Sequence, residues 1–199
     1  MHRSPFYLTH RKQMTPLSGE EFTEEWIYLA HLLTGIAKDL SSEKNHMQAI
    51  EQLKRAQQIW EGIISTHKQD LVQLLSVLIF LIREYVILGK IEDAHALCIQ
   101  TISQWEKQNL TFHQQFLLTY IRYCKALIAA ELTLYDEAIA EYEILFSTWK
   151  NVPKEGMNTF LPIMKQALHA LQDLKEEIDQ QKMAELNQTK LINEIKPFF

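Results

Sequence analysis

Apolar residues recur along this chain at steps of three and four, in long segments separated by short polar stretches. Such steps place side chains on one face of an α-helix, so the pattern predicts an all-helical chain. The predicted helices cover about residues 19–41, 46–62, 67–88, 91–107, 112–133 and 135–150. A further helix is predicted from about residue 158 to 190. Pro162 is expected in its first turn, where proline is tolerated.

An alanine and a tryptophan recur together in this pattern. The alanines lie 45 and 44 residues apart, and each is followed after eleven residues by a tryptophan: Ala49 with Trp60, Ala94 with Trp105, and Ala138 with Trp149. A period of this size is typical of helical repeat arrays. The sequence therefore predicts three helix pairs, in which the alanine lets the two helices approach closely and the tryptophan belongs to the core.

Signals for helix starts and ends follow the same period. Capping boxes, in which a hydroxyl and a side chain three residues later bond reciprocally to backbone amides, are predicted at Ser18 with Glu21, Thr66 with Gln69, and Thr111 with Gln114. Gly89 is suited to a left-handed helix end. Gly35 lies inside a predicted helix, where glycine costs about 1 kcal/mol relative to alanine, so we expect another helix to approach closely there.

The predicted domain organisation is simple. Residues 1–17 are expected to be irregular, and residues 18–199 to form one domain with repeats at about 18–64, 65–109 and 110–153 and a capping helix at about 158–190. The last segment, 191–199, carries Ile192, Ile195, Phe198 and Phe199. We expect this segment either to fold back or to dock on a partner.

Composition and charge narrow the class of protein. Only five glycines and five prolines occur in 199 residues, which favours helices. The net charge of −5, without a dense Lys/Arg stripe, argues against nucleic acid as a direct partner. Cys98 and Cys124 lie within apolar helical patterns, which is typical of reduced core cysteines in a cytoplasmic protein.

No segment predicts a membrane span or a secretory signal. The most apolar stretch, residues 71–88, is interrupted by Gln73, Ser76, Arg83 and Glu84. It is therefore expected to be a buried helix and not a membrane helix.

The sequence carries no motif for catalysis. Two Glu-x-x-His pairs occur, Glu43 with His46 and Glu92 with His95, but they fall at turns in different registers. We expect them to be exposed and far apart, so no metal site is predicted. Nucleophile motifs and phosphate-binding glycine loops are missing, which predicts a protein that is not an enzyme and needs no cofactor.

Two segments carry a resemblance to a known family. Residues 85–94 (YVILGKIEDA) and 134–142 (LYDEAIAEY) resemble the join between the two helices of a tetratricopeptide repeat. The resemblance covers residues 20–150. The family's usual period is 34, so the helices here are longer, and Arg122 and Lys125 stand where the family has apolar residues.

Longer helix pairs of this kind are similar to the sensor domains of Gram-positive bacterial regulators that bind short peptide pheromones. Those regulators usually carry an N-terminal DNA-binding helix-turn-helix, for which residues 1–20 are too short. The resemblance implies a right-handed α-solenoid of three helix pairs plus a C-terminal capping helix. It also implies ligand binding on a concave face lined by the first helix of each pair.

The resemblance places ten residues on that face: His31, Thr34, Lys38, Ser76, Ile79, Arg83, Tyr120, Tyr123, Leu127 and Glu131. Lys38 and Arg83 lie at equivalent positions, 45 residues apart, and are expected to orient an acidic or C-terminal group of the ligand. Tyr123 is favoured over Tyr120 as a ligand contact, because Tyr120 is compatible with the apolar face.

The predicted function is a non-catalytic scaffold or adaptor that binds a protein or peptide. One alternative is a peptide-sensing regulatory domain without its DNA-binding part. A second alternative is a helical-bundle metal-dependent enzyme. No membrane partner is expected, and a homodimer is left open.

Overall fold

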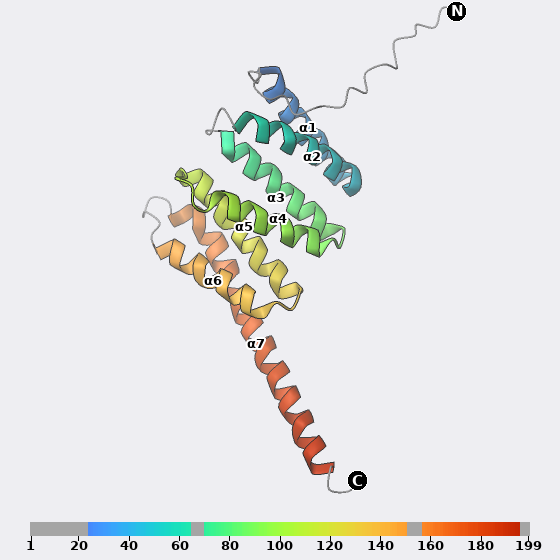
Figure 1. The fold of residues 1–199 in the computed structure, drawn as a ribbon, viewed down its shortest axis with the longest axis vertical. Coiled ribbons are helices and arrows are strands. Elements are labelled where there is room, and N and C mark those ends of the chain that lie inside the picture. The colour runs from blue at the N-terminus through green and yellow to red at the C-terminus, as the bar shows by residue number, and fades with distance from the viewer. Residues whose placement is uncertain (1–23, 65–69, 151–156, 196–199) are drawn as a thin grey trace, which may run out of the picture.

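The computed structural model describes residues 24–64, 70–150 and 157–195, with side chains for residues 24–64, 70–149 and 158–182. In this part of the chain the fold is all-α, with seven helices and no strand (Figure 1). The helices are α1 (Glu24–Ser42), α2 (His46–Ile64), α3 (Leu71–Ile87), α4 (Ile91–Trp105), α5 (Phe112–Glu131), α6 (Tyr135–Lys150) and α7 (Met157–Ile195). Over the described residues, the predicted helices are confirmed to within a few residues at their ends.

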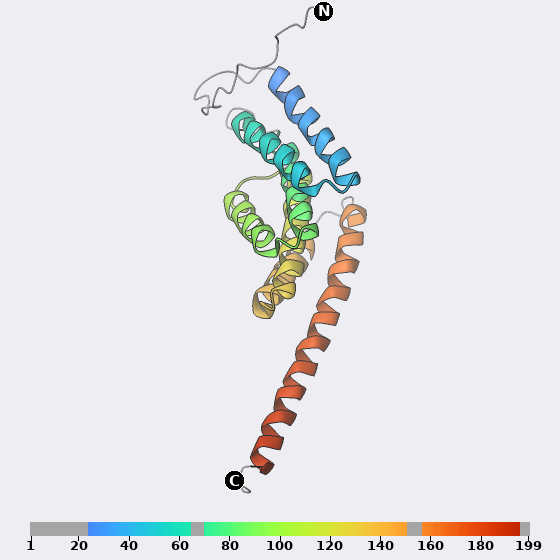
Figure 2. The same cartoon turned by 90° about the vertical axis from the view of Figure 1, so that its right-hand side faces the viewer.

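Each helix packs mainly on its neighbours along the chain. In addition, α3 packs on α5 and α5 packs on α7, so the first helices of successive pairs also touch one another. The N-terminal part of α7 lies against the other helices, and its C-terminal part runs away from them (Figures 1 and 2). Residues 191–195 therefore continue α7 outward and do not fold back onto the molecule.

The turns between paired helices share one backbone structure. Lys44, Gly89 and Thr133 all have positive φ angles, of 65°, 68° and 59°, and lie 45 and 44 residues apart. At Gly89 the turn is closed by two hydrogen bonds, from Gly89 N–H to Val86 O (3.0 Å) and from Lys90 N–H to Tyr85 O (2.9 Å). The same two bonds occur at the other turns, from Lys44 to Ser41 and Asn45 to Leu40, and from Thr133 to Ala130 and Leu134 to Ala129. The period seen in the alanines is thus also a period of the backbone.

Buried side chains form two adjoining clusters, one spanning α1 to α5 and one joining α5, α6 and α7. Ala49, Ala94 and Ala138 are completely buried, as predicted. Trp60 and Trp149 are buried in these clusters, and Trp105 is half-buried against the first. The repeated residues therefore hold the helices of each pair together.

Several local expectations have clear outcomes. The capping box at Thr111 and Gln114 is confirmed, with Thr111 N–H donating to Gln114 Oε1 at 2.9 Å, whereas the other two predicted boxes lie outside the described residues. Cys98 and Cys124 are both free thiols, as expected. The expectation for Gly35 is wrong, since no described atom lies within 4 Å of the position that a Cβ would occupy.

Two further expectations need correction. Pro162 is the sixth residue of α7 as described and lies beyond its first turn. Because proline has no N–H, one carbonyl near the start of α7 lacks its helical hydrogen bond. The cost to helix stability is limited, since only that one bond is lost. Of the two Glu-x-x-His pairs, Glu43 and Glu92 are exposed as expected. His46 and His95 are half-buried, because each packs against a glutamate of another helix. Of the described helices, none combines the length and the apolar character that a membrane crossing requires.

Candidate functional site

An open groove lies between α3, α5 and α7, with a volume of about 780 Å³. Its walls are mainly apolar. They are formed by Ile79, Phe80, Ile82, Arg83, Val86 and Ile87 of α3, by Phe116, Leu117, Tyr120, Cys124, Leu127 and Ile128 of α5, and by Thr159, Pro162 and Ile163 of α7. The groove lies where α3 packs on α5 and α5 packs on α7.

Large apolar side chains remain exposed in this groove. Val86, Ile87 and Leu127 expose 40%, 46% and 39% of their surfaces. Exposed apolar residues are common singly, but a contiguous group lining a concave surface is typical of a binding site. The groove is therefore the strongest candidate for a functional site in the described part of the chain.

A smaller hollow of about 230 Å³ adjoins the groove between α1 and α3. Arg83 and Phe80 line both spaces, and Lys38 lines the smaller one. The ammonium group of Lys38 lies 4.9 Å from the centroid of the Phe80 ring. Among the described residues, neither Lys38 nor Arg83 forms an ion pair with a carboxylate, so the smaller hollow carries two cations, one of which, Arg83, also lines the groove.

The one carboxylate that lines the smaller hollow, Glu84, is engaged elsewhere. Ser41 donates a hydrogen bond to Glu84 Oε1 at 2.7 Å, and His46 Nδ1 lies 2.8 Å from Glu84 Oε2. Glu84 is buried, and these two contacts tie the end of α1 and the start of α2 to α3. Its carboxylate is therefore held by a hydroxyl and an imidazole, which leaves the guanidinium of Arg83 and the ammonium of Lys38 available to a ligand.

Apart from the cation Arg83, the ionisable side chains that line the groove, Tyr120 and Cys124, are neutral near pH 7. Burial raises the pKa of Tyr120, as does the neighbouring Cys124, while the charge of Arg83 partly offsets both effects. Burial also raises the pKa of Cys124 to about 12 and that of Cys98 above its usual range. Neither thiol is thus a reactive thiolate. Tyr120 offers a phenolic hydroxyl as a hydrogen-bond donor.

Five of the ten predicted face residues border these two spaces. Ile79, Arg83, Tyr120 and Leu127 line the groove, and Lys38 lines the smaller hollow beside Arg83. The preference for Tyr123 over Tyr120 is not supported by their positions, because Tyr123 is buried in the second core cluster and Tyr120 lines the groove.

The remaining predicted residues lie elsewhere. The hydroxyls of Thr34 and Ser76 each donate to a carbonyl one turn earlier in their own helix, Ala30 O and Val72 O, at 2.8 Å. The ring of His31 packs edge-on against Trp60, with 5.1 Å between the centroids. Glu131 is exposed and lies outside the lining of either space.

The sequence does not indicate that α7 contributes to the groove. Pro162 and Ile163 form one wall of the groove, although α7 is predicted only as a cap. Val86 and Ile87 were also missed, and the signal that could have found them is their place one turn after Arg83 on the same helix face. No local signal could have indicated that α7 packs near α3.

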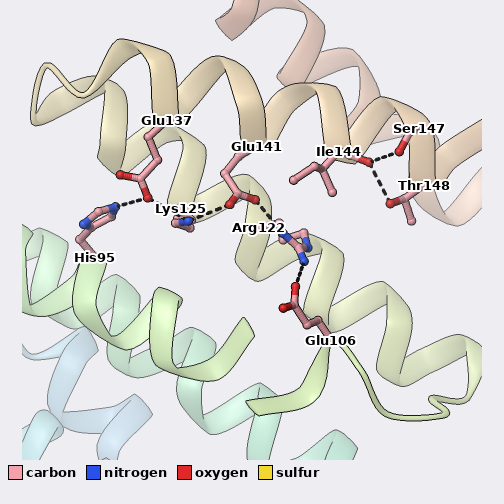
Figure 3. A network of polar contacts seen from close by, with 9 residues as sticks. All are labelled: His95, Glu106, Arg122, Lys125, Glu137, Glu141, Ile144, Ser147 and Thr148. Atoms are coloured by element: carbon pink, nitrogen blue, oxygen red, sulfur yellow. Dashed lines mark hydrogen bonds and ion pairs between the residues drawn. The ribbon is translucent and has the colours of Figure 1, made fainter. Parts of the chain in front are cut away.

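A third hollow, of about 360 Å³, lies near the ends of α4 and α6 and is more polar. Its cation, Arg122, is already paired with Glu106 and, at 2.9 Å, with Glu141 (Figure 3). The guanidinium group is therefore committed to carboxylates of this chain. This hollow is the weaker candidate for an anionic ligand.

Among the described residues, no group of three or more His, Cys, Asp or Glu side chains is placed to hold a metal ion. Comparison with protein-family models found no match, and a search of curated proteins also found none.

Proposed function

We propose that this chain is a non-catalytic binding protein whose groove holds a peptide or a segment of another protein. The observation that carries the proposal is the contiguous set of exposed apolar side chains across α3 and α5, facing a space of about 780 Å³. A space of this size and composition suits the apolar face of a helix or an extended peptide.

The fold proposed with this function is a tetratricopeptide-like, right-handed solenoid of three helix pairs with α7 as a cap. The repeated turns at Lys44, Gly89 and Thr133 support it, as do the buried alanines at the same period. Contacts between α3 and α5 and between α5 and α7 fit the side-by-side first helices of such an array. The groove would then be its concave face.

The two unpaired cations suggest the polarity of the ligand. Arg83 borders both spaces, and Lys38 lines the smaller one, with its ammonium group 4.9 Å from the centroid of the Phe80 ring. An acidic side chain or a C-terminal carboxylate at that end would meet both charges, while apolar side chains would fill the rest of the groove. We therefore expect ligands with an apolar stretch that ends in an acidic group.

A displayed library of random linear peptides tests this proposal on the full chain. Selected peptides should be rich in apolar residues with an acidic or free C-terminal group at one end. The Arg83→Glu variant should bind them about tenfold more weakly, or about 1.4 kcal/mol, because a charge that attracts the ligand becomes one that repels it. Its thermal unfolding should change little, since Arg83 is exposed.

Arg55→Glu is the matched control, because Arg55 is an exposed arginine on α2 and lines neither space. It makes the same change in net charge and should leave peptide affinity nearly unchanged. Equal losses of peptide affinity in the two variants would mean that net charge, and not the position of Arg83, weakens binding. Failure to select any peptide, or full binding by Arg83→Glu, would reject the proposed role of Arg83.

A further inference from the structure

The outer face of α1 differs from the matching faces of α3 and α5. Tyr28, Leu32 and Ile36 form a stripe at four-residue steps and expose 69%, 46% and 39% of their surfaces. Leu32 lies 17 residues before Ala49. The residues 17 positions before Ala94 and Ala138 are Val77 and Ile121, which are 2% and 0% exposed. A face that is buried in the later repeats is thus open in the first.

In α3 two of the three equivalent positions are buried in the first core cluster. They are Val77 and Leu81, equivalent to Leu32 and Ile36 and 2% and 1% exposed, while Gln73, equivalent to Tyr28, is half-buried. Helix α2 packs on α3 and is joined to it by the short connection between Ile64 and Leu71. The corresponding segment before α1 is residues 1–23, which join α1 directly and lie outside the described residues.

The first seventeen residues of that segment complement the stripe in composition. Residues 1–17 include the apolar run Phe6, Tyr7 and Leu8, together with Arg3, Arg11 and Lys12, and contain no Asp or Glu. The stripe itself has acidic neighbours, since α1 begins with Glu24 and Glu25 and carries Asp39 one turn after Ile36. A basic, apolar segment therefore matches the face in both charge and hydrophobicity.

A second copy of the chain matches it less well. Two copies meeting through this face would bring the acidic ends of both stripes together, which is unfavourable. The N-terminal segment is also tethered to α1, so its effective concentration at the stripe is far higher than that of another molecule.

We propose that residues 1–17 dock on the Tyr28–Leu32–Ile36 stripe, with Phe6, Tyr7 and Leu8 supplying the apolar contacts. The segment completes the N-terminal end of the stack and keeps its apolar face from water. This inference is independent of what the groove binds.

Methyl NMR on the full chain with a soluble paramagnetic probe tests the proposal. Leu168 on α7 is the internal reference, because it is 48% exposed, close to the 46% of Leu32. In the native chain the methyl groups of Leu32 and Ile36 should be broadened much less than those of Leu168. In the Phe6→Ser/Leu8→Ser variant this protection should be lost.

A control variant, Met47→Ser/Leu161→Ser, removes two exposed apolar side chains from other surfaces and should keep the protection. Equal broadening of Leu32 and Leu168 in the native chain would overturn the proposal. So would protection that survives the Phe6→Ser/Leu8→Ser change. Protection that grows with protein concentration would assign the face to a second copy and overturn it as well.

Discussion

Helices α3 and α5 occupy equivalent places in successive repeats but differ in what they bury. The buried alanines Ala49, Ala94 and Ala138 are the anchors from which positions in the repeats are counted. Leu78, Leu81 and Leu97 stand at the same distances from Ala94 as Arg122, Lys125 and Glu141 stand from Ala138. Three apolar residues in one repeat are thus replaced by three charged ones in the next. The two repeats nevertheless keep the same turn geometry and the same buried alanine.

The charged positions form a connected network (Figure 3). Glu141 accepts hydrogen bonds from Arg122 at 2.9 Å and from Lys125 at 2.7 Å. Arg122 also pairs with Glu106 of α4, and Lys125 with Glu137 at 2.8 Å. Burial alone would lower the pKa of Lys125, but the hydrogen bonds to Glu137 and Glu141 outweigh burial, so the pKa of Lys125 is raised. The hydrogen bond from Lys125 lowers the pKa of Glu137. Each charged side chain of this network thus has a partner of opposite charge.

The comparison separates two determinants of the fold. The backbone turns and the alanines recur in both repeats and set how the helices align, whereas the residues that fill the interface can be either apolar or ionic. An ionic interface is stable only while its charges remain paired, because an unpaired buried charge carries a large desolvation cost. Substitutions in the network, at the alanines and at the turns test this distinction.

Glu141→Ala should be the most destabilising change, lowering the free energy of unfolding by about 3 kcal/mol in urea titrations. It removes the carboxylate shared by Arg122 and Lys125 and leaves both cations incompletely paired among α4, α5 and α6. Glu143→Ala is the matched control on the same helix, where the side chain is exposed, and should cost less than about 0.5 kcal/mol.

A triple change copies the apolar repeat into the ionic one. Arg122→Leu/Lys125→Leu/Glu141→Leu should recover most of the stability lost in Glu141→Ala, because a well-packed apolar group often replaces a buried ion pair at no net cost. If the triple variant is as unstable as Glu141→Ala, the ion pairs themselves would be required for the alignment of α4, α5 and α6.

Ala94→Leu should destabilise the chain by about 1–3 kcal/mol, because a larger side chain at this fully buried position forces the helices of the second pair apart. The change tests the role of the anchors themselves. Ala96→Leu, at an exposed position on α4, is the control and should have little effect in the same thermal unfolding measurement. Equal melting temperatures for the two variants would contradict the anchor role of Ala94.

Thr133→Gly should stabilise the chain by about 1 kcal/mol in urea titrations. Thr133 is β-branched and has a φ of 59°, a conformation that glycine adopts without strain, as Gly89 does at the equivalent turn. The reverse change, Gly89→Thr, should destabilise by a similar amount. A neutral or destabilising Thr133→Gly would mean that the threonine side chain, and not the backbone, supports this turn.

Much of the fold could be predicted from the sequence because its signals are local. Helix ends, the anchors Ala49, Ala94 and Ala138, and the turn at Gly89 all follow from spacing and residue type. The equivalent turns at Lys44 and Thr133 could not be predicted in this way, since neither is a glycine. Their conformation follows from the packing of the helices on either side.

The site was less predictable because it depends on contacts between distant segments. Arg83 and Leu127 follow from the repeat register, but the wall formed by Pro162 and Ile163 depends on how α7 packs. Arg122 was recognised as an unusual residue for its position, yet its pairing with Glu106 and Glu141 appears only in three dimensions.

The central claim, that the groove holds a polypeptide, is tested most directly by mapping a selected peptide onto the full chain with methyl NMR. The claim predicts shifts concentrated at Ile79, Ile87 and Leu127, with little change at Ile144 near the polar hollow or at Ile99 on α4. Shifts centred on Ile144 or Ile99, with the groove methyl groups unmoved, would contradict it.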